Sequence, residues 1–485
     1  MDSAPSRHLA ADLALSRAAG APLVEGNAVR LLRDGAENYP AWLAAIAAAT
    51  RFVHFDSYIV HDDPTGALFA DALVERARAG VAVRVLYDWV GALRATPRAF
   101  WYRLEDAGVE VRAFNPPTVW RPLAWLSRDH RKMLAVDGEV AYVSGLCVGD
   151  DWTGTADVAA WRDTGVEIRG PAVADVHAQF AEIWATAGAP LPSGEQPAGH
   201  TLATRGPVAL RVIGTTPATA SMLRLDVLVT GLARRRLWIT DAYFVGMPTY
   251  VQALIAAADD GVDVRLFVPG ASDLPLVRSF TRAGYRGLLE GGIRVFEWNG
   301  PMMHAKTAVA DGLWARVGST NLNLQSWMGN WELDVAVEDS AFAGQMEAMF
   351  ERDLTQATEV VLDRAHRHVE TAPAAATAAL DEPIAATEPR GRRPRWRGRG
   401  RHGGSGKAAA GALRLSNTVG AALTAKRTVG ATEAPTLVTG GLVLLAFGGV
   451  AAWWPALLAY PVALLAAWMG LALLRTAVRT RSGGD

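Results

Sequence analysis

Apolar positions along the first 360 residues follow two periods in turn. The stretch 68–79 spaces its apolar side chains as one face of a helix and ends at Gly80, a residue suited to a left-handed helix cap. The next residues, 81–86, alternate between apolar and other side chains, as a half-buried strand does. Strands and helices that alternate in this way predict an α/β fold with a largely buried sheet.

The same pieces of sequence occur twice in the same order. Three matched pairs lie 181 to 185 residues apart: Phe55–Tyr58 with Thr240–Tyr243, Ala79–Leu86 with Asp260–Phe267, and Ala107–Arg112 with Gly291–Phe296. Internal repetition at a nearly constant distance indicates a duplicated unit. We therefore expect an N-terminal extension (1–25) followed by two α/β domains, at 26–195 and 205–360.

The C-terminal region has a different pattern. Thr436–Ala452 and Ala456–Leu474 contain no charged residue, and each is about as long as a membrane span. Between them stands Trp453-Trp454-Pro455, which suits a turn at the headgroup level. The pattern predicts a transmembrane helical hairpin at 436–474. A shallow hairpin that bends at Pro461 and a buried soluble hairpin are the alternatives.

Charge divides the chain into an acidic body and a basic tail. The net charge is -1, but residues 390–485 carry 14 Lys or Arg and only two Asp or Glu. Seven arginines lie between Arg390 and Arg401, inside a segment (370–430) that begins as an Ala/Pro linker. Such a segment beside a membrane span attracts anionic lipid and places its side of the membrane in the cytoplasm. An acidic body argues against nucleic acid as the partner.

One further match carries chemistry: both copies contain the pattern H-x-K-x4-D. Its members are His130, Lys132 and Asp137 in the first copy and His304, Lys306 and Asp311 in the second. On a strand, residues two apart share a face, so each His projects beside its Lys. An imidazole beside a fixed cation is a poor metal site but suits a phosphate, which the Lys stabilises while the imidazole attacks or donates a proton.

The paired motif resembles the phospholipase D superfamily. The whole stretch Gly26–Leu354 resembles its bacterial cardiolipin synthase branch, including Trp161–Thr164, Gly318–Asn323 and Asn330–Glu332. This resemblance implies two domains about a pseudo-two-fold axis with one active site between them. It also implies a covalent phosphohistidine intermediate and no metal or organic cofactor.

The resemblance suggests a role for each motif residue. His130 is expected to attack phosphorus and His304 to act as acid and base, although the sequence alone does not order the two. Asp137 and Asp311 belong to the motif but are expected to hold the fold rather than to touch substrate.

Four further residues complete the predicted site. Asp163 and Glu332 occupy equivalent positions in the two copies, so we expect Asp163 to orient His130 and Glu332 to orient His304. Ser319 and Asn321 are expected to contact the phosphate. The first copy has Cys147 where the second has Asn321, which removes an amide donor. This is the only Cys in the chain, so a disulfide framework and a Cys-built metal site are excluded.

These expectations lead to a hypothesis about function. The chain is predicted to be a phosphatidyltransferase of the bacterial inner membrane, with its catalytic domains facing the cytoplasm, that joins two phosphatidylglycerol molecules into cardiolipin and releases glycerol. A hydrolytic phospholipase D, which uses water as acceptor, is the first alternative. A phosphodiesterase acting on nucleic acid is the second, and the acidic body disfavours it.

Overall fold

The computed structural model describes residues 4–118, 124–362 and 369–373, together with isolated positions between 449 and 471. The chain divides into two compact units, 1–378 and 379–485. The predicted Arg-rich segment and nearly all of the predicted hairpin (436–474) lie outside the described residues, although the isolated positions are helical. None of the helices in the described part of the chain is long and apolar enough to cross a membrane.

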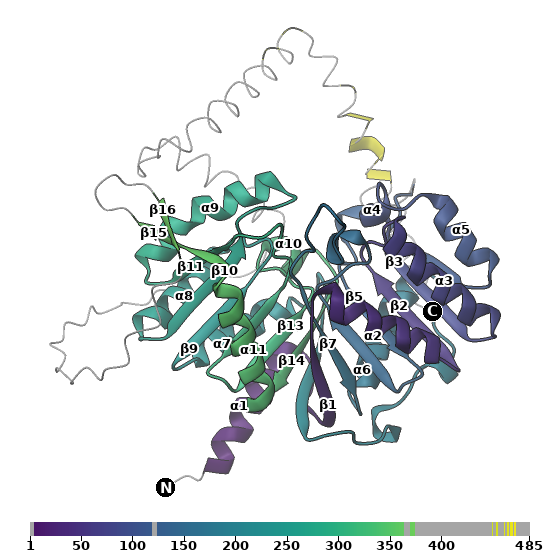
Figure 1. The fold of residues 1–485 in the computed structure, drawn as a ribbon, viewed down its shortest axis with the longest axis horizontal. Coiled ribbons are helices and arrows are strands. Elements are labelled where there is room, and N and C mark those ends of the chain that lie inside the picture. The colour runs from purple at the N-terminus through teal and green to yellow at the C-terminus, as the bar shows by residue number, and fades with distance from the viewer. Residues whose placement is uncertain are drawn as a thin grey trace, which may run out of the picture. The chain divides into compact units, whose positions relative to one another are not determined.

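The first unit is built on a single mixed sheet (Figure 1). Its strand order is β16-β15-β11-β10-β9-β12-β13-β14-β8-β1-β7-β6-β5-β2-β3-β4. The strands are β1 (Val24–Arg33), β2 (Phe52–Ser57), β3 (Ala82–Asp88), β4 (Glu110–Phe114), β5 (Lys132–Val136), β6 (Val140–Ser144), β7 (Thr164–Arg169), β8 (Val208–Thr215), β9 (Arg236–Thr240), β10 (Asp263–Pro269), β11 (Arg294–Trp298), β12 (Thr307–Ala310), β13 (Trp314–Gly318), β14 (Glu332–Glu338), β15 (Ala357–Leu362) and β16 (Val369–Pro373).

Strand order confirms the predicted duplication. Counting outward from the antiparallel pair β1–β8, the first half runs β1-β7-β6-β5-β2-β3-β4 and the second runs β8-β14-β13-β12-β9-β10-β11. In both halves the outer three strands are parallel to one another and the others are antiparallel. Each of these strands therefore has a counterpart across a pseudo-two-fold axis between β1 and β8, whereas β15 and β16 extend the sheet beyond β11.

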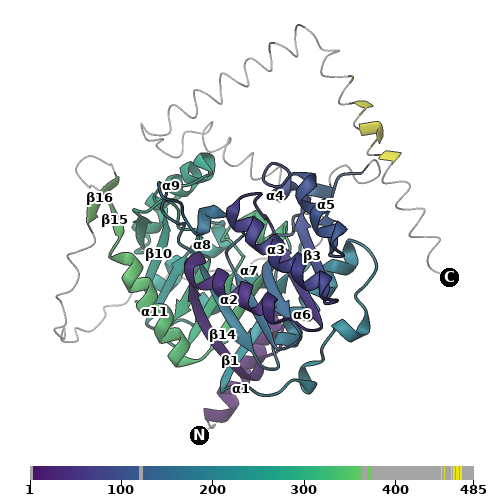
Figure 2. The ribbon, with the colours of Figure 1, turned by 45° about the vertical axis from the view of Figure 1, so that its right-hand side comes forward.

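Helices cover the sheet on both of its faces (Figure 2). They are α1 (Ala4–Ala19), α2 (Asp34–Ala48), α3 (Pro64–Arg78), α4 (Trp89–Ala92), α5 (Arg98–Asp106), α6 (Val173–Thr186), α7 (Ser221–Leu232), α8 (Pro248–Asp259), α9 (Pro275–Glu290), α10 (Leu324–Met328) and α11 (Ser340–Leu354). Short 3-10 turns lie at Ala124–Leu126 and Asp150–Trp152. Because connecting helices shield both faces, the central strands are apolar on both sides, as the sequence predicted.

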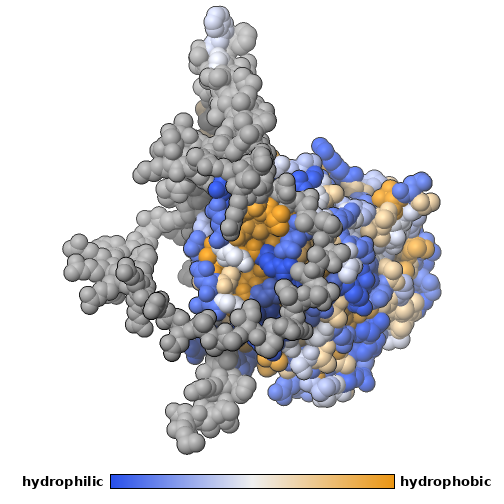
Figure 3. All heavy atoms as spheres, turned by 60° about the vertical axis from the view of Figure 1, so that its left-hand side comes forward, coloured by the Kyte–Doolittle hydropathy of each residue, from blue (hydrophilic) through white to orange (hydrophobic). Residues whose placement is uncertain are grey.

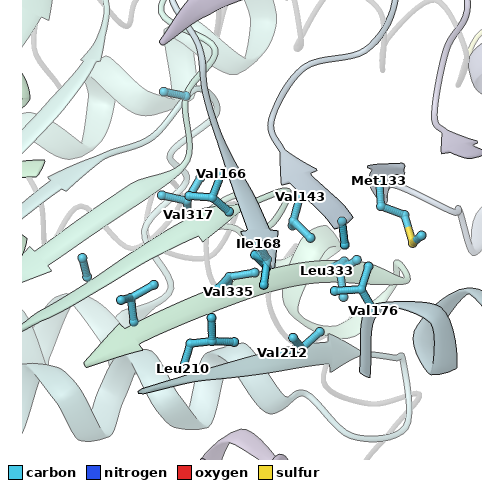
Figure 4. Packing of buried hydrophobic residues seen from close by; sticks show 14 of the residues in the cluster. Met133, Val143, Val166, Ile168, Val176, Leu210, Val212, Val317, Leu333 and Val335 are labelled. Atoms are coloured by element: carbon cyan, nitrogen blue, oxygen red, sulfur yellow. The ribbon is translucent and has the colours of Figure 1, made fainter. Parts of the chain in front are cut away.

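The predicted domains 26–195 and 205–360 share part of their hydrophobic core. A hydrophobic cluster lies across the pseudo-two-fold axis and takes side chains from both halves, among them Val166 and Ile168 of β7 with Val317 of β13 and Val335 of β14 (Figure 4). Two further clusters each belong to one half. The shared cluster and the β1–β8 pair explain why 1–378 forms one compact unit.

Two segments at the ends of the predicted domains pack against this unit. The N-terminal extension (1–25) belongs to the fold, since α1 packs against α7 and the buried Arg211 forms an ion pair with Asp12. β16 takes in residues 369–373, most of which the sequence assigned to the linker, because its backbone pairs with β15. Neither segment has an apolar pattern strong enough to reveal these contacts in advance.

Candidate active site

The two H-x-K motifs begin equivalent strands beside the pseudo-two-fold axis. Lys132 is the first residue of β5, and Lys306 directly precedes β12. The apolar residues that follow in each strand are buried, as predicted, and fix the strand in the core. The motif lysines and histidines themselves are also buried, which removes them from bulk water.

The backbone of each motif histidine is bonded to the opposite half. The N–H of His130 donates to the carbonyl of Trp331 (2.9 Å), and the N–H of His304 donates to the carbonyl of Arg162 (2.7 Å). Isolated bridges between Asp129 and Trp331, and between Arg162 and Met303, accompany these bonds. Both motifs are therefore held at one interface between the halves.

The orienting carboxylates are Asp163 and Glu332, but the predicted pairing is wrong. Nδ1 of His130 lies 2.8 Å from the nearer carboxylate oxygen of Glu332, and Nδ1 of His304 lies 2.7 Å from Asp163. Each histidine is thus oriented by the carboxylate of the other half. The repeat correctly identified the equivalent positions, but it could not show that the partner lies across the axis.

Each carboxylate is fixed by a different set of donors. Glu332 accepts from the Ser319 hydroxyl (2.6 Å) and from the Asn330 amide (3.2 Å). Asp163 accepts from the Trp152 indole N–H (3.0 Å) and from the Thr164 backbone N–H (2.8 Å). Held in this way, a carboxylate that accepts from Nδ1 leaves Nε2 of the imidazole free to react.

Ser319, which was predicted to contact the phosphate, bonds the orienting carboxylate in this structure. It is fully buried, and its hydroxyl accepts from the backbone N–H of Leu333 (2.9 Å) while it donates to Glu332. The sequence could not distinguish a hydroxyl that faces substrate from one that fixes the neighbouring carboxylate. Ser319 positions Glu332.

Both lysines make the same contact, with the backbone carbonyl of the histidine two residues before them. The ammonium of Lys132 donates to the carbonyl of His130 (2.5 Å), and that of Lys306 donates to the carbonyl of His304. Burial and the charge of Lys132 lower the pKa of Lys306 to about 8, although Asp163 opposes this shift. Two buried ammonium groups that repel one another form a site for a shared anion.

Two tyrosines that the sequence analysis gave no role complete the site. The Tyr58 ring meets the His130 ring edge-on (5.0 Å between centroids), and the ammonium of Lys132 lies 5.0 Å from the Tyr58 centroid. Tyr243 repeats both contacts, 5.7 Å from His304 and 5.6 Å from Lys306. The sequence did mark both tyrosines as equivalent, since each is the last residue of the first repeated segment.

The hydroxyl groups of these tyrosines have partners of opposite charge. The Tyr58 hydroxyl accepts from the guanidinium of Arg128 (2.8 Å), whereas the Tyr243 hydroxyl donates to the carboxylate of Asp273 (2.9 Å). Sequence analysis missed Arg128 and Asp273 because neither lies at a repeated position. The first half of the site is therefore the more cationic one.

Burial and the neighbouring charges give the two histidine–carboxylate pairs different pKa values. Burial, Lys132 and Lys306 hold the pKa of His130 well below its ordinary value, and burial raises the pKa of Glu332 to about 7. Burial and Lys306 lower the pKa of His304 only to about 4, because Asp163 favours its protonated form. Burial alone would raise the pKa of Asp163, but His304 and Lys306 lower it below the ordinary value.

Asp137 and Asp311 lie at the far end of the motif strands and hold the fold, as expected. Asp137 accepts backbone N–H bonds from Thr50, Arg51 and Phe52, between 2.7 and 2.9 Å. Asp311 accepts three such bonds, from Arg234, Arg235 and Arg236. Both aspartates tie the motif strand to the start of its neighbour, at the opposite end of the strand from the histidine.

At equivalent positions in the two halves, the second has Asn321 and the first has Cys147. Asn321 is buried, and its amide oxygen has no hydrogen-bond partner among the described residues. Cys147 is also buried, and burial raises the pKa of its thiol, which disfavours a thiolate nucleophile. The free amide keeps Asn321 a predicted substrate contact.

Comparisons with known proteins agree with this arrangement. The family described as cardiolipin synthase, PLD-like domain, matches residues 42–184 and 231–354, one segment in each half. The chain is 33% identical to cardiolipin synthase A of Pseudomonas syringae over 74% of this chain and 75% of that protein. It is 35% identical to cardiolipin synthase A of Pseudomonas aeruginosa over 71% of each.

A solved structure supports the fold alone. The crystal structure of phosphatidylserine synthase from Haemophilus influenzae is similar, with a TM-score of 0.55 at 16% identity, over 75% of this chain and 92% of that chain. The family match covers both halves, and each half supplies one histidine, one lysine and one orienting carboxylate. The chain therefore belongs to the phospholipase D superfamily, in its cardiolipin synthase family, and is an enzyme of the phosphatidyltransferase type.

Proposed function

We propose that this enzyme joins two phosphatidylglycerol molecules into cardiolipin and releases glycerol. The observation that carries the proposal is the pair of buried histidines, each with a carboxylate on Nδ1 and a lysine beside it, at one interface. Such a pair supplies one nucleophile and one acid to the same phosphodiester. Asn321, with its free amide oxygen, is proposed to contact the bound headgroup.

In the first step, Nε2 of His130 attacks phosphorus and forms a P–N bond. The bond between phosphorus and the glycerol oxygen breaks, and His304 gives the leaving oxygen its proton. Lys132 and Lys306 stabilise the negative charge on the phosphoryl oxygens. The products are free glycerol and a phosphatidyl group attached to His130.

In the second step, the hydroxyl of another phosphatidylglycerol reacts. His304 removes the proton of that hydroxyl, its oxygen attacks phosphorus, and the P–N bond breaks to release cardiolipin. Two observations support this order of roles. Asp163 makes His304 the more readily protonated histidine, and Arg128 adds positive charge beside His130.

The predicted hairpin and Arg-rich segment would keep the enzyme at the cytoplasmic face of the inner membrane, close to its substrate. This location is a proposal from the sequence and rests on the uncharged stretches at 436–474.

Product analysis tests the proposal. The purified full-length chain, in vesicles of phosphatidylglycerol, is expected to produce cardiolipin and glycerol in equal amounts. Phosphatidic acid as the only product would show that water is the acceptor and would reject transfer. A ³¹P spectrum of acid-labile phosphohistidine, absent from the His130→Ala variant, checks the intermediate.

A further inference from the structure

The proposed substrate is a phosphate that carries two apolar acyl chains, so exposed apolar side chains near the site are informative. Three large apolar side chains stand out on the second half, at the beginning of α9: Leu274, Leu276 and Phe280. Leu276 is 65% exposed and Phe280 is 56% exposed. Figure 3, which turns the second half forward, shows apolar surface gathered into a patch beside a hydrophilic area.

Helix α9 has the character of a helix that lies on a membrane. Leu276 and Phe280 are four residues apart and share the outward face, which continues with the small residues Ala283, Gly284 and Gly287. Three arginines at the same four-residue spacing lie beside that face, and the helix has no acidic residue before Glu290. An apolar face next to a basic one is typical of helices that bind anionic lipid surfaces.

The arginines of α9 are not all engaged within the protein. Arg282 forms a two-pronged bond with Glu297, and Arg286 bonds Glu290. Arg278 forms no ion pair with any residue that the structure describes. Its charge, next to Leu276 and Phe280, is therefore free to meet a lipid phosphate.

The beginning of α9 is bonded directly to the active site. Asp273, two residues before the helix, accepts from the hydroxyl of Tyr243, whose ring meets His304. Within the helix, the Thr281 hydroxyl donates to the carbonyl of Phe244 (2.6 Å). The N-terminal end of α9 is thus linked, through Asp273 and Tyr243, to the second histidine.

A second group of exposed apolar side chains is also linked to residues of the site. Leu324 and Met328 lie on α10, which follows Asn323, and the amide of Asn323 donates to the carbonyl of Tyr243 (3.0 Å). The neighbouring Gln325 donates to the carbonyl of Leu126 (3.1 Å), itself exposed and two residues before Arg128. We call Leu274, Leu276, Phe280, Leu324, Met328 and Leu126 the apolar rim.

We propose that the apolar rim is the face that docks on a bilayer of anionic phospholipid, with α9 lying in the headgroup layer. Resting on the proposed function, this places the mouth of the site against the membrane, so that a phospholipid enters headgroup first while its acyl chains stay in the apolar phase. Arg278 and Arg128 face the lipid phosphates. Docking by the rim is separate from any attachment through the C-terminal tail, which lies outside the described residues.

A depth measurement tests the docking without requiring turnover. Cys147 is buried, so single cysteines placed at the rim can be labelled selectively. The full-length Leu276→Cys and Phe280→Cys variants, each carrying an environment-sensitive fluorophore, are incorporated into vesicles of phosphatidylglycerol and phosphatidylcholine with nitroxide lipid. Leu313→Cys is the matched control, because Leu313 is 60% exposed but lies in the turn after β12, at the opposite end from His304.

Quenching at positions 276 and 280 is expected to exceed that at position 313 at least about threefold, since only the rim enters the lipid. Equal quenching at all three positions, or none at 276 and 280, would overturn the proposal. This readout is independent of the reaction, so an enzyme that proved to hydrolyse its lipid could still dock in this way.

Kinetics supply a second test. The Leu276→Ser/Phe280→Ser double variant is expected to lose about tenfold in turnover on vesicles, through a higher apparent KM, because two apolar contacts with lipid are lost. Turnover of short-chain phosphatidylglycerol below its critical micelle concentration should stay within about twofold. An equal loss on both substrates would reveal damage to the site, and no loss on vesicles would remove the docking role.

Discussion

The two halves share a fold and a motif, but each orients the histidine of the other half by different means. In the second half, the longer Glu332 is fixed by the Ser319 hydroxyl. In the first half, the shorter Asp163 is fixed by the Trp152 indole, and Gly145 stands where the second half has Ser319. Any side chain at position 145 would collide with Asp163, since a Cβ there would lie 2.2 Å from its carboxylate oxygen.

Surroundings of the two imidazoles differ as well. His304 is enclosed by the rings of Trp152, Trp161 and Tyr243. Among the ring contacts between described residues, His130 has only the one with Tyr58. The first half adds the cation Arg128 and the second adds the anion Asp273, each through a tyrosine hydroxyl.

A pair of similar groups performs two roles when the environment separates their proton affinities. Here the separation comes from the carboxylates: Asp163 stays ionised and favours a protonated His304, whereas burial raises the pKa of Glu332 to about 7. The duplicated fold thus supplies matching geometry, and the unmatched neighbours supply the difference between nucleophile and acid.

The largest expected effect comes from the histidines themselves. His130→Ala and His304→Ala should each lower kcat by about 10³-fold or more, because a nucleophile or a positioned acid is lost. A phosphatidyl ester of p-nitrophenol, whose leaving group needs no proton, separates the two. His304→Ala should still release one burst of nitrophenol, and His130→Ala should release none.

The exposed His200 gives the matched control, since His200→Ala should retain full turnover. A burst from His130→Ala and none from His304→Ala would mean that the halves have exchanged roles. Bursts from both would contradict a covalent intermediate on either histidine.

Glu332 should control the pH dependence of the rate. Substitutions of Glu332 and Asp163 should change the free energy of unfolding in opposite directions. Protonation of Glu332 removes the negative charge from the acceptor of Nδ1 of His130, so kcat/KM should fall as pH decreases through about 7. Glu332→Gln should lower kcat by about 100-fold, a typical loss for a positioning group, and should remove this pH limb. Both are measured in a pH–rate profile.

The pKa of each carboxylate in the folded state decides whether its substitution raises or lowers the free energy of unfolding. Because the pKa of Glu332 is raised, its stabilising contribution is present below its ordinary pKa and is lost as pH rises to about 7. Glu332→Gln should therefore raise the free energy of unfolding at pH 8 by about 1–3 kcal/mol. The pKa of Asp163 is lowered, so Asp163→Asn should lower that free energy at pH 8. Denaturant titrations measure both, and equal signs would contradict the assignment.

Smaller effects are expected at the partners of the tyrosines. Arg128→Gln should raise KM for phosphatidylglycerol about tenfold, since a charge-assisted contact to phosphate is lost. Asp273→Asn should leave KM nearly unchanged but favour water over the alcohol, because an amide holds the Tyr243 hydroxyl, and with it the ring beside His304, less firmly than a carboxylate does. The ratio of cardiolipin to phosphatidic acid reports the second effect.

Asp259→Asn is the control for Asp273, since Asp259 is exposed at the end of α8. Identical changes in KM and product ratio for Arg128→Gln and Asp273→Asn would show that the two sides of the site are equivalent.

The smallest effect on chemistry belongs to the motif aspartates. Asp137→Ala and Asp311→Ala should each cost about 2–3 kcal/mol of stability, since three backbone N–H groups lose a charged acceptor. Turnover per folded molecule should stay within about twofold. Thermal unfolding and active-site titration test this, and a loss of kcat in folded enzyme would place these aspartates in the reaction.

Most of this arrangement was predictable from the sequence because duplication makes equivalent positions visible. The repeats gave the α/β architecture, both H-x-K motifs and the two orienting carboxylates. Pairing across the axis was not predictable, because a repeat shows which residues correspond and not which of them touch. For the same reason, Ser319 was assigned to the phosphate although it bonds Glu332.

Residues that break the symmetry were the hardest to find. Arg128, Trp152 and Asp273 have no repeated counterpart, so no comparison of the two copies selects them. Their roles depend on loops, whose course follows from tertiary contacts and not from local pattern. Tyr58 and Tyr243 are intermediate cases, since they were visible as a repeat but carried no chemistry until their rings were placed.

The β1–β8 pair joins the copies in the manner of an isologous dimer fused into one polypeptide. Two identical chains related by a true two-fold would have to present the same donors to both imidazoles, so any change that improved the nucleophile would be imposed on the acid. Fusion removes this constraint. Once the copies are encoded separately, a glycine can replace a serine on one side alone, and specialisation of the two histidines becomes accessible to single substitutions.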